Sequence, residues 1–294
     1  MGREEDFQKL SPLENTIVGI LVGIFEVSVM QPTLYLKNAS QQGLPYTLDP
    51  RKLYRGLAMS ITNMSGEYVF DNTLYFLICP SCCLCPVLTG LQFPLTGIVT
   101  TAITGNKRRP LSATEQISAG FVGGALSGIA CAPMELVLIQ QQRFGGSIVS
   151  TPGRIISSFG TTGLFRGLAV SCGREGVFTA GYLGIGPALT SHLVHDQDMS
   201  PVSAKVWGAL VGGVIAGTLS HPMDTIKSCQ QGDLEQKVYT TVTQTARTLL
   251  GDGGVRRLFR GWGFRTGRMI VGVGLINEFR YMVAPILFPR HFDE

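Results

Sequence analysis

The sequence predicts an all-α membrane protein with six transmembrane helices, arranged as three repeats of two helices. Three observations support this fold class. Charged residues make up 15% of the 294 residues, whereas soluble proteins carry about 25%. Glycine accounts for 37 residues, and small residues allow membrane helices to approach one another closely. The third observation is an internal repeat.

The repeat is marked by the prolines Pro32, Pro133 and Pro222, which are 101 and 89 residues apart. Each proline has a glycine nine residues before it and a glutamine nine residues after it, and a Leu-aromatic-Arg-Gly phrase follows in each unit. The repeated positions are Gly23, Gly124 and Gly213, then Gln41, Gln142 and Gln231, then Gly56, Gly167 and Gly261. These spacings divide the chain into three units, 1–111, 112–202 and 203–294.

Each unit contains two apolar stretches of the length that a membrane helix needs, about 20 residues. The first stretches lie at about 15–36, 117–134 and 206–223, and the second at about 57–79, 168–193 and 262–288. The repeated prolines end the first stretch or lie within it, and proline removes a helix hydrogen bond. We therefore predict kinks at Pro32, Pro133 and Pro222.

The orientation follows from the charges between the stretches. The segments that join the first to the second stretch of each unit, 37–55, 138–167 and 227–265, carry 14 Lys or Arg and 4 acids, and the segments outside the apolar stretches on the other side carry 7 and 9. Because positive loops face the inner compartment, these joining segments are predicted to lie inside. Both termini are then predicted to lie on the opposite side of the membrane.

With these features, the chain resembles the mitochondrial carrier family, whose three repeats carry the signature Pro-x-[Asp/Glu]-x-x-[Lys/Arg]. The segments that carry the resemblance are QPTLYLKNASQQ from Gln31, APMELVLIQQQ from Ala132 and HPMDTIKSCQQ from His221. The resemblance implies a pseudo-threefold barrel in the mitochondrial inner membrane, with both termini in the intermembrane space. It also implies short amphipathic helices on the matrix side, for which 144–163 and 236–250 are candidates.

The resemblance implies a matrix-side gate made of acid–base pairs. An acid and a base three residues apart share one helix face, and partly exposed ion pairs contribute only about 0.2–1 kcal/mol each, which suits a gate that must open. The ring is incomplete here, because Leu34 replaces the first acid and Leu138 the second base. In the pairing that the resemblance implies these two positions are partners, so a Leu–Leu contact is expected in place of the third ion pair. The expected gate residues are Lys37, Glu135, Asp224 and Lys227, paired as Glu135–Lys227 and Asp224–Lys37, with Gln41, Gln142 and Gln231 bracing the pairs.

A substrate site is expected at the level of the second helices. Ionisable residues deep in a membrane span are costly and usually functional. The candidates are Asn63, Glu67, Asp71, Arg174, Glu175 and Arg268. Arginine offers a planar fork to a carboxylate, and a glutamate can accept an ammonium group, so an amino-acid-like or carboxylate metabolite is the expected substrate. The alternative is that Arg174 and Arg268 are paired internally with Glu67, Glu175 or Asp71. Glu26 and Glu278 either face the cavity or bond a neighbour.

The segment 80–111 has no counterpart in the other units and carries part of a cysteine cluster, Cys79, Cys82, Cys83 and Cys85. We expect reduced thiols rather than a metal site, and we regard the segment as a candidate surface for a protein partner. Two functions compete. The first is a solute transporter that works by alternating access at one central site. The second is a carrier-fold structural subunit of an inner-membrane complex, which the lost gate pair, the absence of an outer ring of ion pairs and the segment 80–111 favour.

Other classes of function find no support in the sequence. No phosphate-binding or catalytic motif is present, so we expect neither an enzyme nor a cofactor. The net charge of +4 is too small for a nucleic-acid-binding protein. The expected partners are a small metabolite and membrane lipid, with cardiolipin as one candidate at the matrix-side helix ends.

Overall fold

The computed structural model describes residues 11–63, 98–100, 102–103 and 112–292. None of these residues lies in a strand, and the all-α prediction is confirmed for this part of the chain. The long helices are α2 (Pro12–Gln42), α6 (Ala113–Phe144), α8 (Leu168–His195), α9 (Pro201–Gly232) and α12 (Trp262–Leu287). The short ones are α3 (Pro50–Leu53), α7 (Ser150–Phe159), η2 (Thr161–Phe165), α10 (Val242–Gly253), α11 (Val255–Leu258) and η3 (Pro289–His291).

Several of the sequence predictions fall outside the described residues. They concern the second apolar stretch beyond residue 63, the side chains Glu67 and Asp71, the cysteine cluster, and most of the segment 80–111. The chain is helical over 57–63, which is the predicted start of that second stretch.

A serine cap begins the first helix of every unit. Ser11, Ser112 and Ser200 each accept a hydrogen bond from the backbone N–H three residues further on. In α2 and α6 a glutamate at that third position bonds back to the serine N–H, which completes a capping box. These serines lie 21, 21 and 22 residues before the repeated prolines, so they belong to the same repeat.

The repeated prolines lie inside helices rather than at helix ends. Pro32, Pro133 and Pro222 fall within α2, α6 and α9, each of which continues for at least ten residues beyond its proline. The charged signature that follows each proline is therefore helical. The side chains at its acidic and basic positions share one face of these final turns.

The glycines of the Arg-Gly phrases share one backbone conformation and one kind of neighbour. Gly56, Gly167 and Gly261 have φ values of 80°, 79° and 86°, which an L-residue adopts only with strain. A Cβ at Gly56 would lie 2.6 Å from Leu138 on α6, one at Gly167 3.4 Å from Gln231 on α9, and one at Gly261 3.0 Å from the Lys37 carbonyl oxygen on α2. Each unit thus packs against the first helix of the next unit, and the third unit packs against the first.

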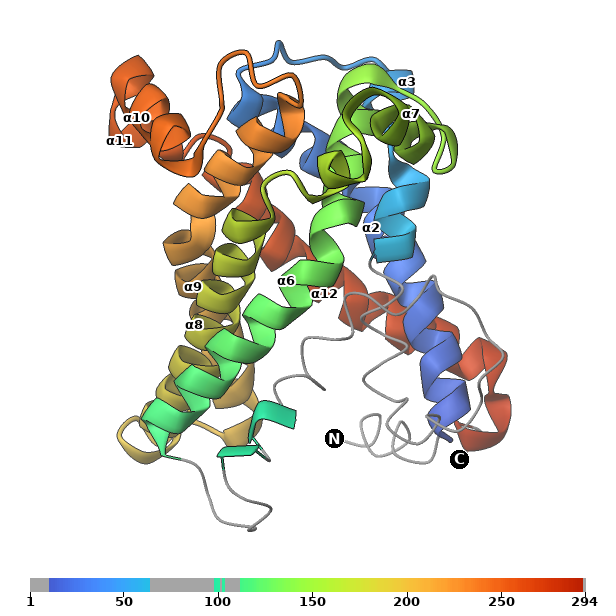
Figure 1. Ribbon diagram of the computed structural model, residues 1–294. Coiled ribbons are helices and arrows are strands. Elements are labelled where there is room, and N and C mark those ends of the chain that lie inside the picture. Colours follow the sequence, from blue (N-terminus) through green and yellow to red (C-terminus); the bar gives the residue numbers. More distant parts are fainter. Residues whose placement is uncertain (1–10, 64–97, 101, 104–111, 293–294) are drawn as a thin grey trace.

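The long helices pack side by side in an order that follows the chain. Glycines bring α6 against α8 and α8 against α9: a Cβ at Gly128 would lie 2.7 Å from Cys172 Cα, and one at Gly212 would lie 2.9 Å from Gly186 Cα. Phe25 of α2 stacks on Phe279 of α12 with ring centroids 3.9 Å apart. Helix α12 also contacts α9, so the described helices form an arc that runs from α6 to α2 (Figure 1).

The short helices α3, α7, α10 and α11 lie at one end of this bundle, and the start of α2, the end of α12 and η3 lie at the other (Figure 1). Helix α7 falls within the predicted range 144–163, and α10 begins within the predicted range 236–250 and extends three residues beyond it, so a short helix is confirmed at both places. Their location on the matrix side stays a prediction. In the first unit the corresponding segment contains only the four residues of α3. In that unit the aromatic residue that precedes Arg-Gly lies 22 residues after the proline, whereas the distances in the other two units are 32 and 37 residues. The shorter segment leaves less room for a longer helix.

Polar as well as apolar side chains are buried within the bundle, and large apolar side chains are exposed on its outside. Gln31, Gln41, Gln231 and His221 are fully buried, whereas Trp207 and Leu219 of α9 are more than half exposed. In the part of the chain that the structure describes, three segments are long and apolar enough to cross a membrane: Ile17–Gln42, Thr114–Phe144 and Val255–Leu287. Helices α8 and α9, with 28 and 32 residues, are long enough to cross a membrane but are not among these three segments. The count of six spans stays a prediction.

Candidate substrate site and gate

A cavity of about 510 Å³ lies between the long helices and contains most of the charged side chains of the bundle. It is lined from α2, α6, α8, α9 and α12, and by Ser60 and Asn63 of the segment 57–63. Its basic side chains are Lys37, Arg174, Lys227, Arg265 and Arg268, and its acidic ones are Glu26, Glu135, Glu175 and Asp224. Both signs of charge are therefore available to a ligand in the described wall.

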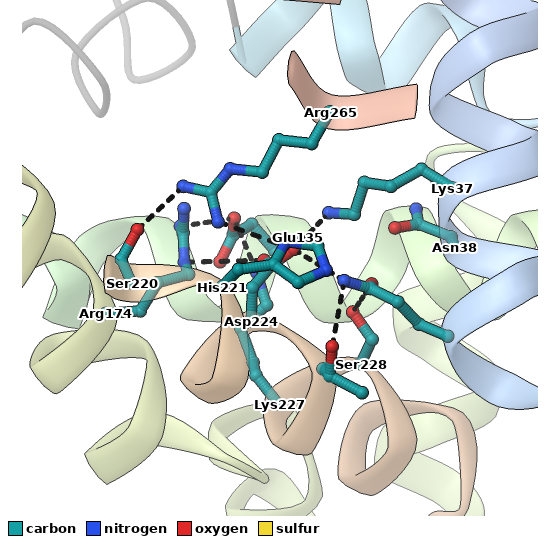
Figure 2. Close-up of polar contacts among 12 residues, drawn as sticks. Lys37, Asn38, Glu135, Arg174, Ser220, His221, Asp224, Lys227, Ser228 and Arg265 are labelled. Carbon is teal, nitrogen blue, oxygen red and sulfur yellow. Dashed lines mark hydrogen bonds and ion pairs between the residues drawn. The ribbon is translucent and has the colours of Figure 1, made fainter. Parts of the chain in front are cut away.

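Asp224 of α9 is the centre of the larger group of charges. Its Oδ2 atom lies 2.6 Å from Lys37 Nζ, and its Oδ1 atom lies 3.4 Å from Lys227 Nζ. Arg174 and Arg265 approach it at 3.7 and 3.8 Å. Figure 2 shows these side chains converging from four helices on one carboxylate, which is only 2% exposed. A single acid on α9 thus links α2, α8 and α12.

Glu135 of α6 is the second anchor. Its Oε1 atom lies 2.8 Å from Lys227 Nζ and accepts a hydrogen bond of 2.7 Å from Arg174 Nη2. The structure therefore contains both of the ion pairs that the resemblance implied, Asp224–Lys37 and Glu135–Lys227. Arg174 also bonds the neighbouring Glu175.

The contact between α2 and α6 is apolar where the third ion pair is missing. Leu34 packs against a cluster of buried side chains that includes Leu138 and Leu136. One helical turn further along, Asn38 Nδ2 donates to Gln142 Oε1 at 2.6 Å. The two losses from the signature therefore meet at one interface, as the sequence comparison of the units suggested.

The three repeated glutamines have different partners. Gln41 donates to Asp224 at 2.8 Å and accepts from Ser228 at 2.7 Å, so it braces the Asp224–Lys37 pair as expected. Gln142 accepts from Asn38, because its interface holds no ion pair to brace, and Gln231 donates to the Ala132 carbonyl oxygen at 3.3 Å. The expected bracing role is thus visible at Gln41, while the contacts of Gln142 and Gln231 differ from it.

A second, separate ion pair lies in the same cavity. Arg268 of α12 donates from Nε and Nη2 to the two carboxylate oxygens of Glu26 on α2, at 3.3 and 3.4 Å. The partner of Arg268 is thus Glu26. For this acid the sequence analysis left open whether its side chain faces the cavity or bonds a neighbouring residue. Arg174 bonds Glu175, as the alternative of internal pairing stated. Glu278, the other undecided acid, is exposed and outside the cavity lining.

Sequence reasoning missed Arg265 entirely. Its Nη2 atom donates to Ser220 Oγ at 3.0 Å and its Nη1 atom faces Asp224. Arg265 lies three residues before Arg268 and four after Gly261. The helical spacing that placed Arg268 in the cavity puts Arg265 on the same face, so the register alone could have identified it.

An arc of long helices around one charged cavity, with ion pairs joining the final turns of proline-containing helices, is the architecture of a membrane carrier protein. The sequence profile of the family described as mitochondrial carrier protein matches residues 109–196 and 198–278, which cover most of the second and third units. An uncharacterised mitochondrial carrier of Schizosaccharomyces pombe is 32% identical over 296 residues, covering 96% of this chain and 95% of the relative. The chain belongs to the mitochondrial carrier family.

Other relatives carry names that state a substrate. A mitochondrial glycine transporter of Aspergillus niger is 24% identical over 279 residues, covering 87% of this chain and 85% of the relative. A mitochondrial dicarboxylate/tricarboxylate transporter of Arabidopsis thaliana is 23% identical over 185 residues, covering 59% and 62%. Family membership implies the mitochondrial inner membrane as the location of the chain.

Proposed function

We propose that this protein transports a small solute across the mitochondrial inner membrane by alternating access at the cavity between its helices. The observation that carries the proposal is the position of the ion-pair network. It joins the final turns of α2, α6 and α9 at the edge of the cavity and includes Arg174, a residue of the cavity wall.

The network gives the site a way to respond to a ligand. Arg174 contacts Glu135 and Asp224, which also hold the lysines of α2 and α9. A ligand carboxylate that binds Arg174 competes with these two acids and weakens their hold on α8. A ligand can shift a conformational equilibrium only by binding the two states unequally, and competition for Arg174 supplies that difference.

The substrate we propose is small and amino-acid-like or a carboxylate. The cavity offers arginines to a carboxylate and glutamates to an ammonium group. The names of the glycine and dicarboxylate/tricarboxylate transporters among the relatives agree with this chemistry. Asn63, Arg174, Glu175 and Arg268 line the cavity and are the proposed contacts; the expected contacts Glu67 and Asp71 lie outside the described residues.

The remaining features of the topology are part of the same proposal. The chain would have six spans in three pseudo-threefold units, 1–111, 112–202 and 203–294, with α7 and α10 on the matrix side. Both termini would face the intermembrane space. Membrane lipid, including cardiolipin, would contact the matrix-side helix ends, and the segment 80–111 would be available to a protein partner.

Uptake into proteoliposomes tests the proposal. The purified protein is reconstituted and offered radiolabelled glycine, succinate and citrate, with the same solute inside the vesicles. We expect saturable uptake of at least one solute, and we expect Arg174→Ala to reduce that uptake at least about tenfold, as the loss of one charged contact predicts. Lys205→Gln, at an exposed position near the start of α9, is the control and should transport normally.

Two results would contradict the proposal. Unchanged uptake in Arg174→Ala would remove Arg174 from the site. No uptake by the intact protein, together with its purification inside a large complex in which the segment 80–111 is protected, would support the structural-subunit alternative instead.

A further inference from the structure

The cavity contains two arginine–glutamate pairs, and their surroundings differ. Arg174 contacts three carboxylates, those of Glu135, Glu175 and Asp224. Among the described residues, Arg268 forms an ion pair with Glu26 alone. A ligand at Arg174 must compete with three acids, whereas a ligand at Arg268 must displace one.

The Glu26–Arg268 pair is also the looser of the two in its geometry. Its contacts are 3.3 and 3.4 Å long, whereas charge-assisted hydrogen bonds between nitrogen and oxygen are about 2.7–2.9 Å. The pairs at the ends of α2, α6 and α9 reach 2.6 and 2.8 Å. The long contacts mean that opening the Glu26–Arg268 pair sacrifices less electrostatic energy than opening a gate pair.

Burial decides what kind of ligand can open the pair. The side chains of Glu26 and Arg268 are 4% and 21% exposed, and a buried charge that loses its partner is strongly destabilised. An anion that took Arg268 would leave Glu26 without a counterion, and a cation that took Glu26 would leave Arg268 alone. A zwitterion satisfies both groups at once.

The packing of α2 against α12 leaves room for this exchange. A Cβ at Gly272, one helical turn beyond Arg268, would lie 3.3 Å from Glu26 Oε1, so the glycine provides the space in which the carboxylate lies. The stacked rings of Phe25 and Phe279 join the same two helices. The charges can therefore part by movement of the Arg268 side chain into the cavity while the helices stay together.

We infer that Glu26 and Arg268 form the head-group site for a zwitterionic, amino-acid-like solute, with the carboxylate of the solute on Arg268 and its ammonium group on Glu26. This inference rests on the proposed transport function and narrows its substrate class. It also assigns the main head-group contacts to α2 and α12, while Arg174 on α8 stays the contact through which the solute competes with Glu135 and Asp224. Glu26 then determines the specificity for an amine.

Glycine and glycolate make a matched pair of probes, because glycolate has a hydroxyl group in place of the ammonium group. Their binding is measured as inhibition of labelled glycine uptake and as a ligand-induced rise in the unfolding temperature of the purified full chain. For the unaltered protein we expect glycine to bind at least about tenfold more tightly than glycolate, the difference that one charged contact makes. In Glu26→Gln we expect glycine to bind at least about tenfold more weakly and glycolate to bind at least as tightly as before, because glycolate no longer leaves a buried acid without a counterion, so that the preference disappears.

Two controls separate this result from a general loss of structure. Glu278→Gln makes the same substitution on α12 at an exposed position outside the cavity, and it should keep the preference for glycine. If Glu26→Gln does not fold because Arg268 is left unpaired, the double variant with Glu26→Gln and Arg268→Gln removes both charges together. That variant should fold and should show no preference between glycine and glycolate.

Several outcomes would overturn the inference. They are a preference for glycine that survives Glu26→Gln or the double variant, a preference that is lost in Glu175→Gln instead, and an intact protein that transports only anions such as succinate or citrate. In each of these cases uptake by the unaltered protein would still support the proposed function. If the unaltered protein transports no solute at all, the proposed function itself fails.

Discussion

The two charged regions of the cavity use the same side-chain chemistry but differ in the number of partners. At the ends of α2, α6 and α9, Asp224 lies within 3.8 Å of four basic side chains and accepts a further hydrogen bond from Gln41. Between α2 and α12, Glu26 and Arg268 hold each other at 3.3 Å or more. The comparison teaches that a network holds helices together, whereas a single long pair can exchange partners with a ligand.

Removing the centre of the network should have the largest effect. Asp224→Asn leaves a neutral side chain among four basic groups that are each at most 12% exposed, and breaking a buried ion pair costs about 3–5 kcal/mol. We expect the free energy of unfolding to fall by about that amount, measured by thermal or denaturant unfolding in detergent. Asp198→Asn, at an exposed position with φ of 49° that asparagine tolerates, is the control and should stay within about 0.5 kcal/mol of the unaltered protein.

Removing the acid of the looser pair should cost less. Glu26→Gln keeps a hydrogen-bonding group beside Arg268, which is partly exposed to the cavity, so we expect a loss of about 1–3 kcal/mol in the free energy of unfolding. The measurement is the same unfolding experiment. If Glu26→Gln destabilised the protein as much as Asp224→Asn, the contrast between a network and an exchangeable pair would be wrong.

Restoring the missing third ion pair tests whether the ion-pair network can extend to the contact between α2 and α6. Leu34→Asp or Leu138→Lys alone introduces an unpaired charge at an apolar contact and should destabilise the protein. The double variant should recover about 0.5–3 kcal/mol relative to the sum of the single changes, the usual range for residues in contact. A double-mutant cycle on unfolding measures this coupling, and we expect slower transport as well. Additive effects would show that α2 and α6 do not meet closely enough to pair.

The smallest effect is expected at an acid of α9 outside the network. Burial favours the neutral form of Asp233, but the backbone N–H groups of Tyr239, Val238 and Lys237 donate to its carboxylate and hold its pKa below the ordinary value of 3.8. The ionised form therefore stabilises the folded protein above pH 3.8, and this contribution is lost as the pH falls through the lower folded pKa. We expect Asp233→Asn to cost about 1 kcal/mol near neutral pH, and its difference from the unaltered protein should shrink in acid. A constant difference from about pH 6 to pH 2 would contradict this linkage.

The arrangement of the repeats was largely predictable because its signals are local and recur three times. A proline, a glutamine nine residues later and an Arg-Gly phrase specify a helix, its final turns and the left-handed glycine that begins the next helix. The serine caps at Ser11, Ser112 and Ser200 belong to the same pattern, although the sequence analysis did not use them. Local signals of this kind act through backbone hydrogen bonds within a few residues.

The pairing of charges was predictable only in part. Asp224–Lys37 and Glu135–Lys227 followed from the resemblance, because the repeats fix which helix ends meet. The partners of Arg174 and Arg268 did not follow, since each guanidinium can reach several acids, and distances between side chains on different helices are absent from sequence periodicity. Arg265 was missed for the same reason, although its register was available.

The sequence by itself determined the class of the protein and the positions of the long helices. These depend on composition, on the period of the helix and on a repeat that is visible along the chain, whereas the ion-pair partners and the interface that lost its pair followed from the family resemblance. The tertiary structure alone decided that Arg174 joins the ion-pair network of Asp224 and Glu135, that Gln41 is the repeated glutamine that bonds Asp224, and that Arg268 faces Glu26 across α2 and α12. Those choices depend on which side chains approach within a few ångströms when helices pack, because Coulomb energy and desolvation both change steeply over that distance.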